Sequence, residues 1–337
     1  MASLLLCTLT AVLSMEFLVG NVGNGFVVLV NCRAWLGRRK MSAVDQILTT
    51  LAISRIGMLG VTFLNYWVTL CDPSVLMNAN ILRTIYIPWA IVNHFSLWLA
   101  TSLSIYYFLR IANFSNAFFL YLKYRVKMVV SGTLLVSLAL LLANTVLMNL
   151  YIDVWIHSSE TNASSTPRGD FAKLLLTPSF IFSILPFLIS LAAFLLLIVS
   201  LWKHGRRMLA HRSAPKGGPA LRGPPAPRDS RTAAHIWALS SVIAFLLLYT
   251  LFFLAFLLQI CKFEFLEKSL IILFCQVMAL AFPMGHSIVL ILGTRKLRGA
   301  ALSALGGCGV VGHCRRPGGL GSLEPAAGSG RNTVPGK

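Results

Sequence analysis

The sequence predicts an all-α membrane protein, a bundle of seven transmembrane helices with its N-terminus outside the cell. Three observations support this class. Hydrophobic residues make up 57% of the 337 residues and charged residues only 12%, whereas soluble proteins carry roughly 25% charge. The apolar residues fall into seven long runs. Positive charge alternates from one connecting segment to the next.

The apolar runs are long enough to cross a bilayer, which takes about 20 residues per helix. They are 8–31, 47–70, 86–109, 128–150, 174–201, 236–260 and 269–292. The first has no basic segment before it and no small-residue cleavage site, so we interpret it as a retained span and not as a signal peptide. We expect one helical domain over residues 1–300, followed by a flexible cytosolic tail, 301–337, that is rich in Gly and Pro.

The net charge of +19 lies almost entirely on one side of the predicted bundle. The segments 32–46, 110–127 and 202–235 and the tail from Gly293 together carry +20, the opposite segments carry −1, and the spans are neutral. Because cytoplasmic segments are enriched in Lys and Arg, this pattern places the N-terminus outside and the C-terminus inside. The alternative, a large soluble helical core, would make the alternation a coincidence. The pattern also argues against nucleic-acid binding, which +19 alone would suggest.

Two glycosylation sequons fall on opposite sides of this topology. Asn162-Ala-Ser lies in a segment that is predicted to be outside, so Asn162 is the candidate glycosylation site. Asn113-Phe-Ser lies on the cytosolic side and should stay unmodified.

Polar side chains within the spans are the first candidate functional residues. At 1.5 Å per residue, Arg55 lies about 14 Å from the cytosolic end of its span, Asn24 about 12 Å, and His286 and Ser287 about 10 Å. We therefore expect Arg55 to bond Asn24 and the Ser287 region, which would tie the first, second and seventh helices together. The alternative is that Arg55 faces a water-filled cleft. Glu16 lies about 12 Å above Asn24 and could line a cavity or reach Arg55 through water.

A second group of polar and aromatic residues lies nearer the outside. Trp89 and Asn93 are one turn apart on the same face of the third span. An Asn at this depth must bond a ligand, a water or a partner helix. Gln276 lies at a comparable depth in the seventh span, and Phe252 in the sixth fits helix packing. We expect His94 to be a structural partner and not a ligand contact.

Neither catalysis nor metal binding has support in the sequence. Glu16 is the single acid in the spans, so a paired-carboxylate site is absent, and no nucleophile–base set follows from the spacing of Ser and His. Cys308 and Cys314 have poor spacing for zinc, and their position beside the membrane allows S-palmitoylation as an alternative. We expect no enzymatic activity, no cofactor and no metal.

Several longer motifs occur in a characteristic order along the chain. They are Leu51-Ala-Ile-Ser-Arg55, Tyr107-Phe-Leu-Arg-Ile-Ala-Asn-Phe-Ser-Asn116, Pro186-Phe-Leu-Ile-Ser-Leu191, Ser200-Leu-Trp-Lys-His-Gly-Arg-Arg-Met208, Ala234-His-Ile-Trp-Ala-Leu-Ser-Ser-Val-Ile243 and His286-Ser-Ile-Val-Leu-Ile-Leu-Gly-Thr-Arg-Lys-Leu297. From about residue 10 to 300 the chain resembles the type 2 taste receptors, the bitter receptors of vertebrates. Vomeronasal type 1 receptors have a similar topology, but the first and last motifs favour taste receptors. A seven-helix transporter or channel is the alternative from another class.

The resemblance implies a G-protein-coupled receptor of the plasma membrane for small bitter molecules. It implies signalling through a gustducin-type heterotrimeric G protein to phospholipase C and calcium release. The agonist pocket implied by the resemblance lies in the outer half of the bundle and contains Trp89, Asn93, Phe252 and Gln276. The basic residues that would rim a cytosolic cleft for the G protein are Arg110, Lys203, Arg206 and Arg207. For any one of these, anchoring by the positive-inside rule is the alternative role.

Overall fold

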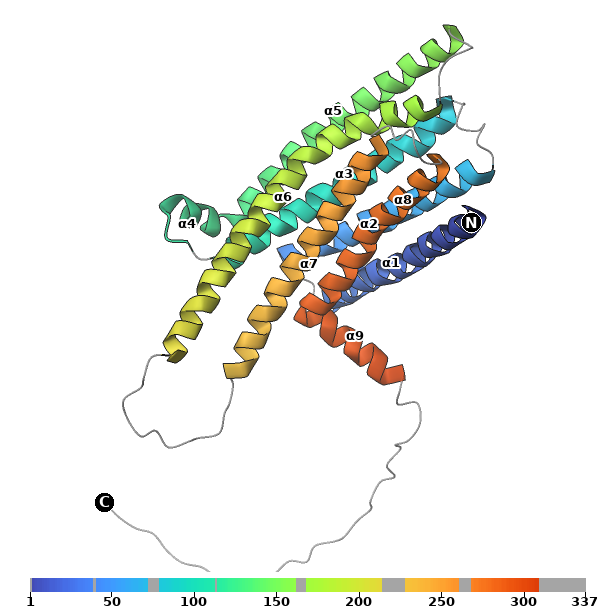
Figure 1. Cartoon of the computed structure of the whole chain (residues 1–337). Coiled ribbons are helices and arrows are strands. Elements are labelled where there is room, and N and C mark those ends of the chain that lie inside the picture. Colours follow the sequence, from blue (N-terminus) through green and yellow to red (C-terminus); the bar gives the residue numbers. More distant parts are fainter. Residues whose placement is uncertain are drawn as a thin grey trace, which may run out of the picture.

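The computed structural model describes residues 2–38, 41–71, 79–112, 114–161, 168–213, 228–260 and 268–308, and these residues are almost entirely helical. The helices are α1 (Ala2–Arg38), α2 (Ala43–Cys71), α3 (Ala79–Ile111), α4 (Ala117–Tyr124), α5 (Val126–Thr161), α6 (Arg168–Ser213), α7 (Arg228–Ile260), α8 (Lys268–Gly293) and α9 (Arg295–Cys308). Figure 1 shows the long helices side by side in one bundle, with the short α4 and α9 projecting from it. We call the end where α1 starts the N-terminal end, and the other the α9 end.

Six of the long helices are apolar enough to cross a membrane over at least 18 residues, namely α1, α2, α5, α6, α7 and α8. The long helix α3 is more polar, because it carries buried Asn, His, Ser and Thr side chains. It packs against α2, α5 and α6, and Figure 1 shows it among the other helices. A helix surrounded by protein can bury polar groups against its neighbours, so α3 is the seventh membrane-crossing helix. The prediction of an all-α, seven-helix membrane protein is confirmed.

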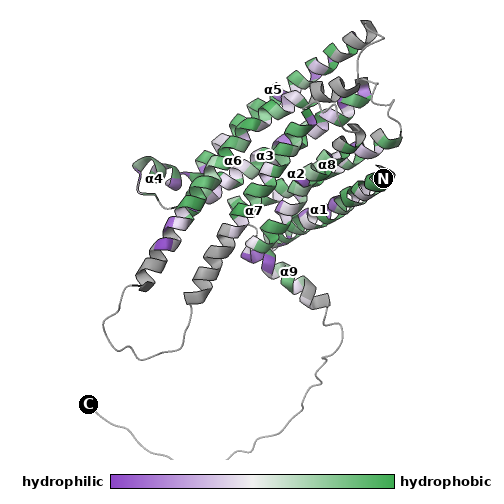
Figure 2. Ribbon diagram, in the orientation of Figure 1, coloured by the Kyte–Doolittle hydropathy of each residue, from purple (hydrophilic) through white to green (hydrophobic). Residues whose placement is uncertain are grey.

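The neighbouring helices of the bundle form a closed ring of which α3 is a member, with α5 packed on α3 and α6. In order, α1 packs on α2, α2 on α3, α3 on α5 and α6, α6 on α7, α7 on α8, and α8 back on α1. Large apolar side chains such as Leu135, Leu142, Leu185 and Leu247 point outward and are exposed, as the lipid-facing surface of a membrane protein requires. Figure 2 shows hydrophobic residues along the helices of the bundle, with hydrophilic residues at α4, at the α9 end of α6 and at the start of α9.

The structure differs from the sequence-based expectation in its connecting segments. The short helix α4 lies between the third and fourth spans, where no helix was predicted. Helix α9 continues to Cys308 and so extends into the segment 301–337 that was expected to be a flexible tail. The connecting segment 202–235 is shortened from both sides, because α6 continues to Ser213 and α7 begins at Arg228. Pro186 and Pro283 lie inside α6 and α8.

Candidate functional site

An aromatic group joins α3, α6 and α7 in the half of the bundle near the N-terminal end. Trp89 of α3 meets Phe256 of α7 edge to face, with ring centroids 5.8 Å apart. Phe256 also contacts Phe252, one turn along α7, at 6.0 Å, and Phe180 of α6 at 5.5 Å. Trp89 and Phe252, two of the expected pocket residues, are thus linked through Phe256, which the sequence reasoning did not single out.

Asn93 adds an unsatisfied polar group one helical turn from Trp89. Its side chain is 2% exposed, and its Oδ1 accepts no hydrogen bond from the residues that the structure describes. Burying an amide oxygen without a donor costs about 1–3 kcal/mol. A hydrogen bond donated to this oxygen by a ligand or by water would offset that cost. Asn93 is therefore the polar residue of an otherwise aromatic candidate site.

Gln276, the fourth expected pocket residue, is partly exposed on α8. Its helix neighbours Leu273 and Leu280 pack with Leu13 of α1 and Leu59 of α2. The ring contacts that join Trp89 to Phe252 do not reach Gln276 among the described residues. Its assignment to the same pocket therefore rests on the resemblance alone.

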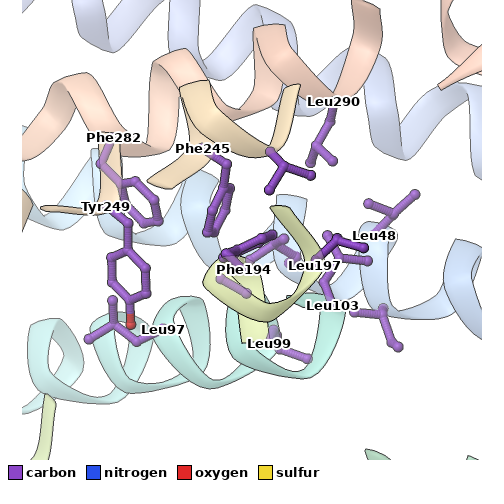
Figure 3. Packing of buried hydrophobic residues seen from close by; sticks show 14 of the residues in the cluster. Leu48, Leu97, Leu99, Leu103, Phe194, Leu197, Phe245, Tyr249, Phe282 and Leu290 are labelled. Atoms are coloured by element: carbon purple, nitrogen blue, oxygen red, sulfur yellow. The ribbon is translucent and has the colours of Figure 1, made fainter. Parts of the chain in front are cut away.

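A chain of rings leads from this aromatic group into the middle of the bundle. Phe252 lies 5.4 Å from Phe282 of α8, and Phe282 stacks on Tyr249 at 5.1 Å and on the His286 ring at 5.8 Å. Figure 3 shows Tyr249 and Phe282 side by side, with the Tyr249 hydroxyl reaching toward α3 beside Leu97. Tyr249 is fully buried, and the apolar run around it offered no sequence signal for its central position.

Arg55 lies at the inner end of this ring chain. It is 1% exposed, and its guanidinium carbon lies 5.1 Å from the centre of the Phe282 ring. Its Nη2 donates a hydrogen bond to Nδ1 of His286. Because a guanidinium can only donate, Nδ1 must be the accepting nitrogen of a neutral imidazole, and the ring proton resides on Nε2. The bond ties α2 to α8.

Asn24 and Ser287 join α1 to α8 at the same level. Asn24 Nδ2 donates to the Gly20 carbonyl at 2.8 Å and to the Pro283 carbonyl at 3.4 Å, while Ser287 Oγ lies 3.1 Å from that same Pro283 carbonyl. A side chain at Gly23 would press on Ser287, since its Cβ would lie 3.2 Å from Oγ, so glycine permits this close approach. Within the described contacts Arg55 bonds His286 and not Asn24, and the three helices meet through α8.

A hydroxyl cluster holds α3 to α6 where Pro186 interrupts the hydrogen-bond ladder of α6. Thr101 Oγ1 lies 2.8 Å from Ser190 Oγ and 3.0 Å from the Pro186 carbonyl. Ser104 Oγ donates toward Ser190 at 3.5 Å. The Tyr249 hydroxyl lies near this cluster but outside hydrogen-bond geometry. His94 similarly ties α3 to α5, because its Nε2 lies 2.8 Å from the Ser137 carbonyl, a structural contact as the sequence suggested.

Glu16 is buried in α1, with 5% exposure, and its Oε2 has no hydrogen-bond partner among the described residues. Side chains on a helix point toward its N-terminus, so the Glu16 carboxyl extends away from the level of Asn24 and Arg55. The described contacts include no link between Glu16 and Arg55.

The α9 end carries the expected basic residues and one clamp that the sequence reasoning missed. Arg110, Lys203 and Arg206 are exposed, and the Arg206 guanidinium carbon lies 5.0 Å from the centre of the Trp202 ring. Arg207 lies in α6, but its side chain is outside the described part of the structure, and Asn162 lies outside the described residues altogether.

The clamp is formed by Lys296 at the start of α9. Its Nζ lies 3.1 Å from Asp45 Oδ1 at the start of α2 and 2.8 Å from Asn31 Oδ1 near the end of α1. Asp45 is the single acid of segment 32–46, a sequence signal that could have indicated a basic partner. In the part of the chain that the structure describes, no group of three or more His, Cys, Asp or Glu side chains could hold a metal ion.

Known proteins match this chain over nearly the whole described bundle. Residues 1–308 match the family model described as taste receptor protein (TAS2R). The chain is 47% identical over 302 residues to taste receptor type 2 member 117 of Rattus norvegicus, an alignment that covers 88% of this chain and 91% of the relative. The chain belongs to the taste receptor type 2 family. The receptor is also 45% identical over 300 residues to taste receptor type 2 member 14 of Pongo pygmaeus, covering 88% and 90% of the two chains.

Membership of this family decides the class of function. The receptor is a multi-pass membrane protein and a bitter taste receptor of the G-protein-coupled class, so it binds small ligands and couples to G proteins. It is not an enzyme. The described residues include an aromatic group and a buried, unpartnered amide oxygen in one half of the bundle, and exposed basic side chains at the other end.

Proposed function

We propose that this receptor resides in the plasma membrane and converts binding of a bitter small molecule into calcium release through a gustducin-type G protein and phospholipase C. The unsatisfied Asn93 oxygen beside the Trp89–Phe256 contact is the observation that carries the ligand assignment. Binding sites for small molecules are largely apolar, with a few placed polar groups that fix orientation. Aromatic rings with one buried acceptor favour an amphipathic agonist that offers a hydrogen-bond donor. Trp89, Asn93 and Phe252 form the core of the proposed pocket, with Gln276 at its edge.

The proposed orientation places residues 1–300 as the receptor domain with the N-terminus outside, and 301–337 as a cytosolic tail. Its support is the charge difference between the two ends, +20 against −1. In this orientation Asn162 receives a glycan. The aromatic group then opens toward the outside, and the basic cluster of Arg110, Lys203, Arg206 and Arg207 faces the cytosolic G protein.

The proposed mechanism is a shift of population toward an active bundle. An agonist activates only if it binds the active arrangement more tightly than the resting one. The ring chain from Trp89 through Phe256, Phe252 and Phe282 ends on Arg55, so a ligand that repositions α7 against α3 changes the packing around the polar centre. Because α6 packs on α7 and carries Lys203, Arg206 and Arg207, while Arg110 is on α3, this movement would open a basic cleft at the α9 end.

A calcium assay tests this proposal. Cells expressing the receptor together with a gustducin-type Gα subunit are screened against a broad panel of bitter compounds, with surface expression measured by antibody staining of an N-terminal tag. We expect agonist-evoked calcium release that disappears without the Gα subunit and in the presence of a phospholipase C inhibitor. Silence across the panel with confirmed surface expression would contradict the proposal. A response that survives without any G protein would instead indicate a channel or transporter.

A further inference from the structure

We infer that α4 carries a binding surface for anionic lipid headgroups at the membrane boundary. Its outward surface is aromatic, with Phe118 70% exposed and Tyr124 88% exposed, and Tyr121 and Leu120 lie beside them. Such side chains are seldom left in water on so short a helix. Tyr is enriched where a membrane meets water, because its ring is apolar and its hydroxyl is polar.

The helix is held so that this surface must point away from the bundle. On the opposite side Phe119 is buried and packs edge to face on Phe108 at 5.4 Å and on Phe114 at 5.2 Å. The Asn116 side chain caps the helix by accepting from the Phe118 N–H, and Lys123 Nζ donates to the Ala112 carbonyl at 2.9 Å. With one face fixed in the core, the aromatic face has no freedom to turn inward.

The charge around α4 fits an anionic partner. Segment 110–127 has four basic residues and no acid. The Arg125 guanidinium carbon lies 5.0 Å from the centre of the Tyr121 ring, its Nη1 lies 3.9 Å from the Met128 sulfur, and Lys127 is exposed as the second residue of α5. A thioether sulfur is a weak acceptor, so the exposed guanidinium keeps strong N–H donors for the oxygens of a phosphate.

The position of α4 selects a lipid as the occupant. Helix α5 begins two residues after α4, and its membrane-compatible stretch starts at Val126. Met128, in the first turn of α5, is exposed and apolar, as are Leu135 and Val136 further along. The aromatic surface of α4 is therefore continuous with a face that contacts acyl chains, and Figure 1 shows α4 projecting sideways from that end of α5. A surface that combines aromatic and basic residues at this level suits the headgroup region of a leaflet with anionic lipid.

This inference uses the orientation set out under the proposed function, but its lipid measurement needs neither an agonist nor a G protein. The full-length receptor is placed in nanodiscs of phosphatidylcholine alone or with phosphatidylserine, and hydrogen exchange is measured for segment 114–127. We expect exchange in α4 to slow when phosphatidylserine is present. The double variant Arg125→Gln/Lys127→Gln should lose this response, and its apparent affinity for phosphatidylserine should fall about fivefold per charge removed.

Two further variants separate a local site from general attraction or misfolding. Arg33→Gln/Arg295→Gln removes two exposed charges elsewhere and should leave the response of α4 intact. Arg125→Lys/Lys127→Arg preserves the charge and should retain the response. Equal exchange in both lipids, or an equal loss in the Arg33→Gln/Arg295→Gln control, would overturn the inference. So would an α4 that ignores lipid but is protected by added G protein, which would identify a protein-docking surface.

Discussion

Individual polar side chains at the centre of this bundle connect one helix to another. Arg55 is 1% exposed, bonds His286 and lies over the Phe282 ring. A cation in the interior of a membrane protein requires such partners, since its burial otherwise costs several kcal/mol. The sequence identified Arg55 and the correct depth on α8 by counting residues from the helix ends. It could not identify His286 Nδ1 as the acceptor, because helix rotation and side-chain direction decide which of two adjacent residues faces the guanidinium.

Replacement of Arg55 by Ala should destabilise the receptor. The change removes a hydrogen bond from a charged donor and leaves His286 with a buried, unpaired acceptor, which together cost about 3 kcal/mol. We expect a lower thermal unfolding midpoint for the purified receptor and a smaller fraction at the cell surface, or raised basal signalling. Arg33→Ala, an exposed position on α1, is the matched control and should behave as wild type. Wild-type stability and signalling in Arg55→Ala would contradict the role of this residue as a tie between helices.

Replacement of Asn93 by Ala should reduce agonist potency without reducing stability. Its oxygen has no partner among the described residues, so its loss removes no internal hydrogen bond, while an agonist that donates to it loses about tenfold in potency. Concentration–response curves and surface staining measure the two effects. Thr62→Val removes another buried unpartnered oxygen, on α2, and should leave potency unchanged. Unchanged potency of Asn93→Ala for every agonist would exclude Asn93 from the pocket.

Among the helices, α3, α4 and α9 are the ones whose place in the fold is not clear from their amino-acid composition alone. Helix α3 is long but too polar to meet a simple hydropathy criterion, because it packs against α2, α5 and α6 and directs His94 toward α5 and Thr101 toward α6. Its apolar run still indicated a span. Helices α4 and α9 were not predicted, because each follows a membrane span after a very short break and neither has a long apolar run. The capping Asn116 was the available signal for α4.

The contacts of Lys296 with Asp45 and Asn31 should hold the start of α9 against the other helices. Lys296→Met removes the contacts to Asp45 and Asn31 that attach α9 to α2 and α1. The pair with Asp45 is partly exposed and contributes at most about 1 kcal/mol of unfolding free energy. Loss of the donor to the buried Asn31 oxygen adds about 1–3 kcal/mol. We expect faster hydrogen exchange at the start of α9 and higher basal calcium signalling. Arg295→Met removes a neighbouring exposed charge and should change neither measurement. Wild-type exchange at the start of α9 in Lys296→Met would show that the clamp does not hold this helix.

For the whole molecule, composition and charge determine much of the architecture before any contact is known. Seven apolar runs are enough to predict the bundle, since a bilayer admits only closed hydrogen-bonded elements such as helices. The ring chain that connects Trp89 to Arg55 could not be predicted, because it depends on Phe252, Phe256 and Phe282 facing one another across helices whose apolar composition is nearly uniform. The polar residues of the site could be identified from the sequence, because each polar side chain inside a membrane needs a bonding partner.

The orientation of the whole receptor is predicted by the distribution of charge and can be tested by glycosylation. If the end with −1 is outside, Asn162-Ala-Ser reaches the lumen during synthesis and receives a glycan, while Asn113-Phe-Ser stays in the cytosol. Treatment with a glycosidase should lower the apparent mass of the wild-type receptor. The shift should vanish in Asn162→Gln and persist in Asn113→Gln, its matched control. An N-terminal tag should be stained on intact cells, and a C-terminal tag only after permeabilisation. The reverse staining, or a glycan that depends on Asn113, would require the basic end to face outward against the charge rule that orients membrane helices.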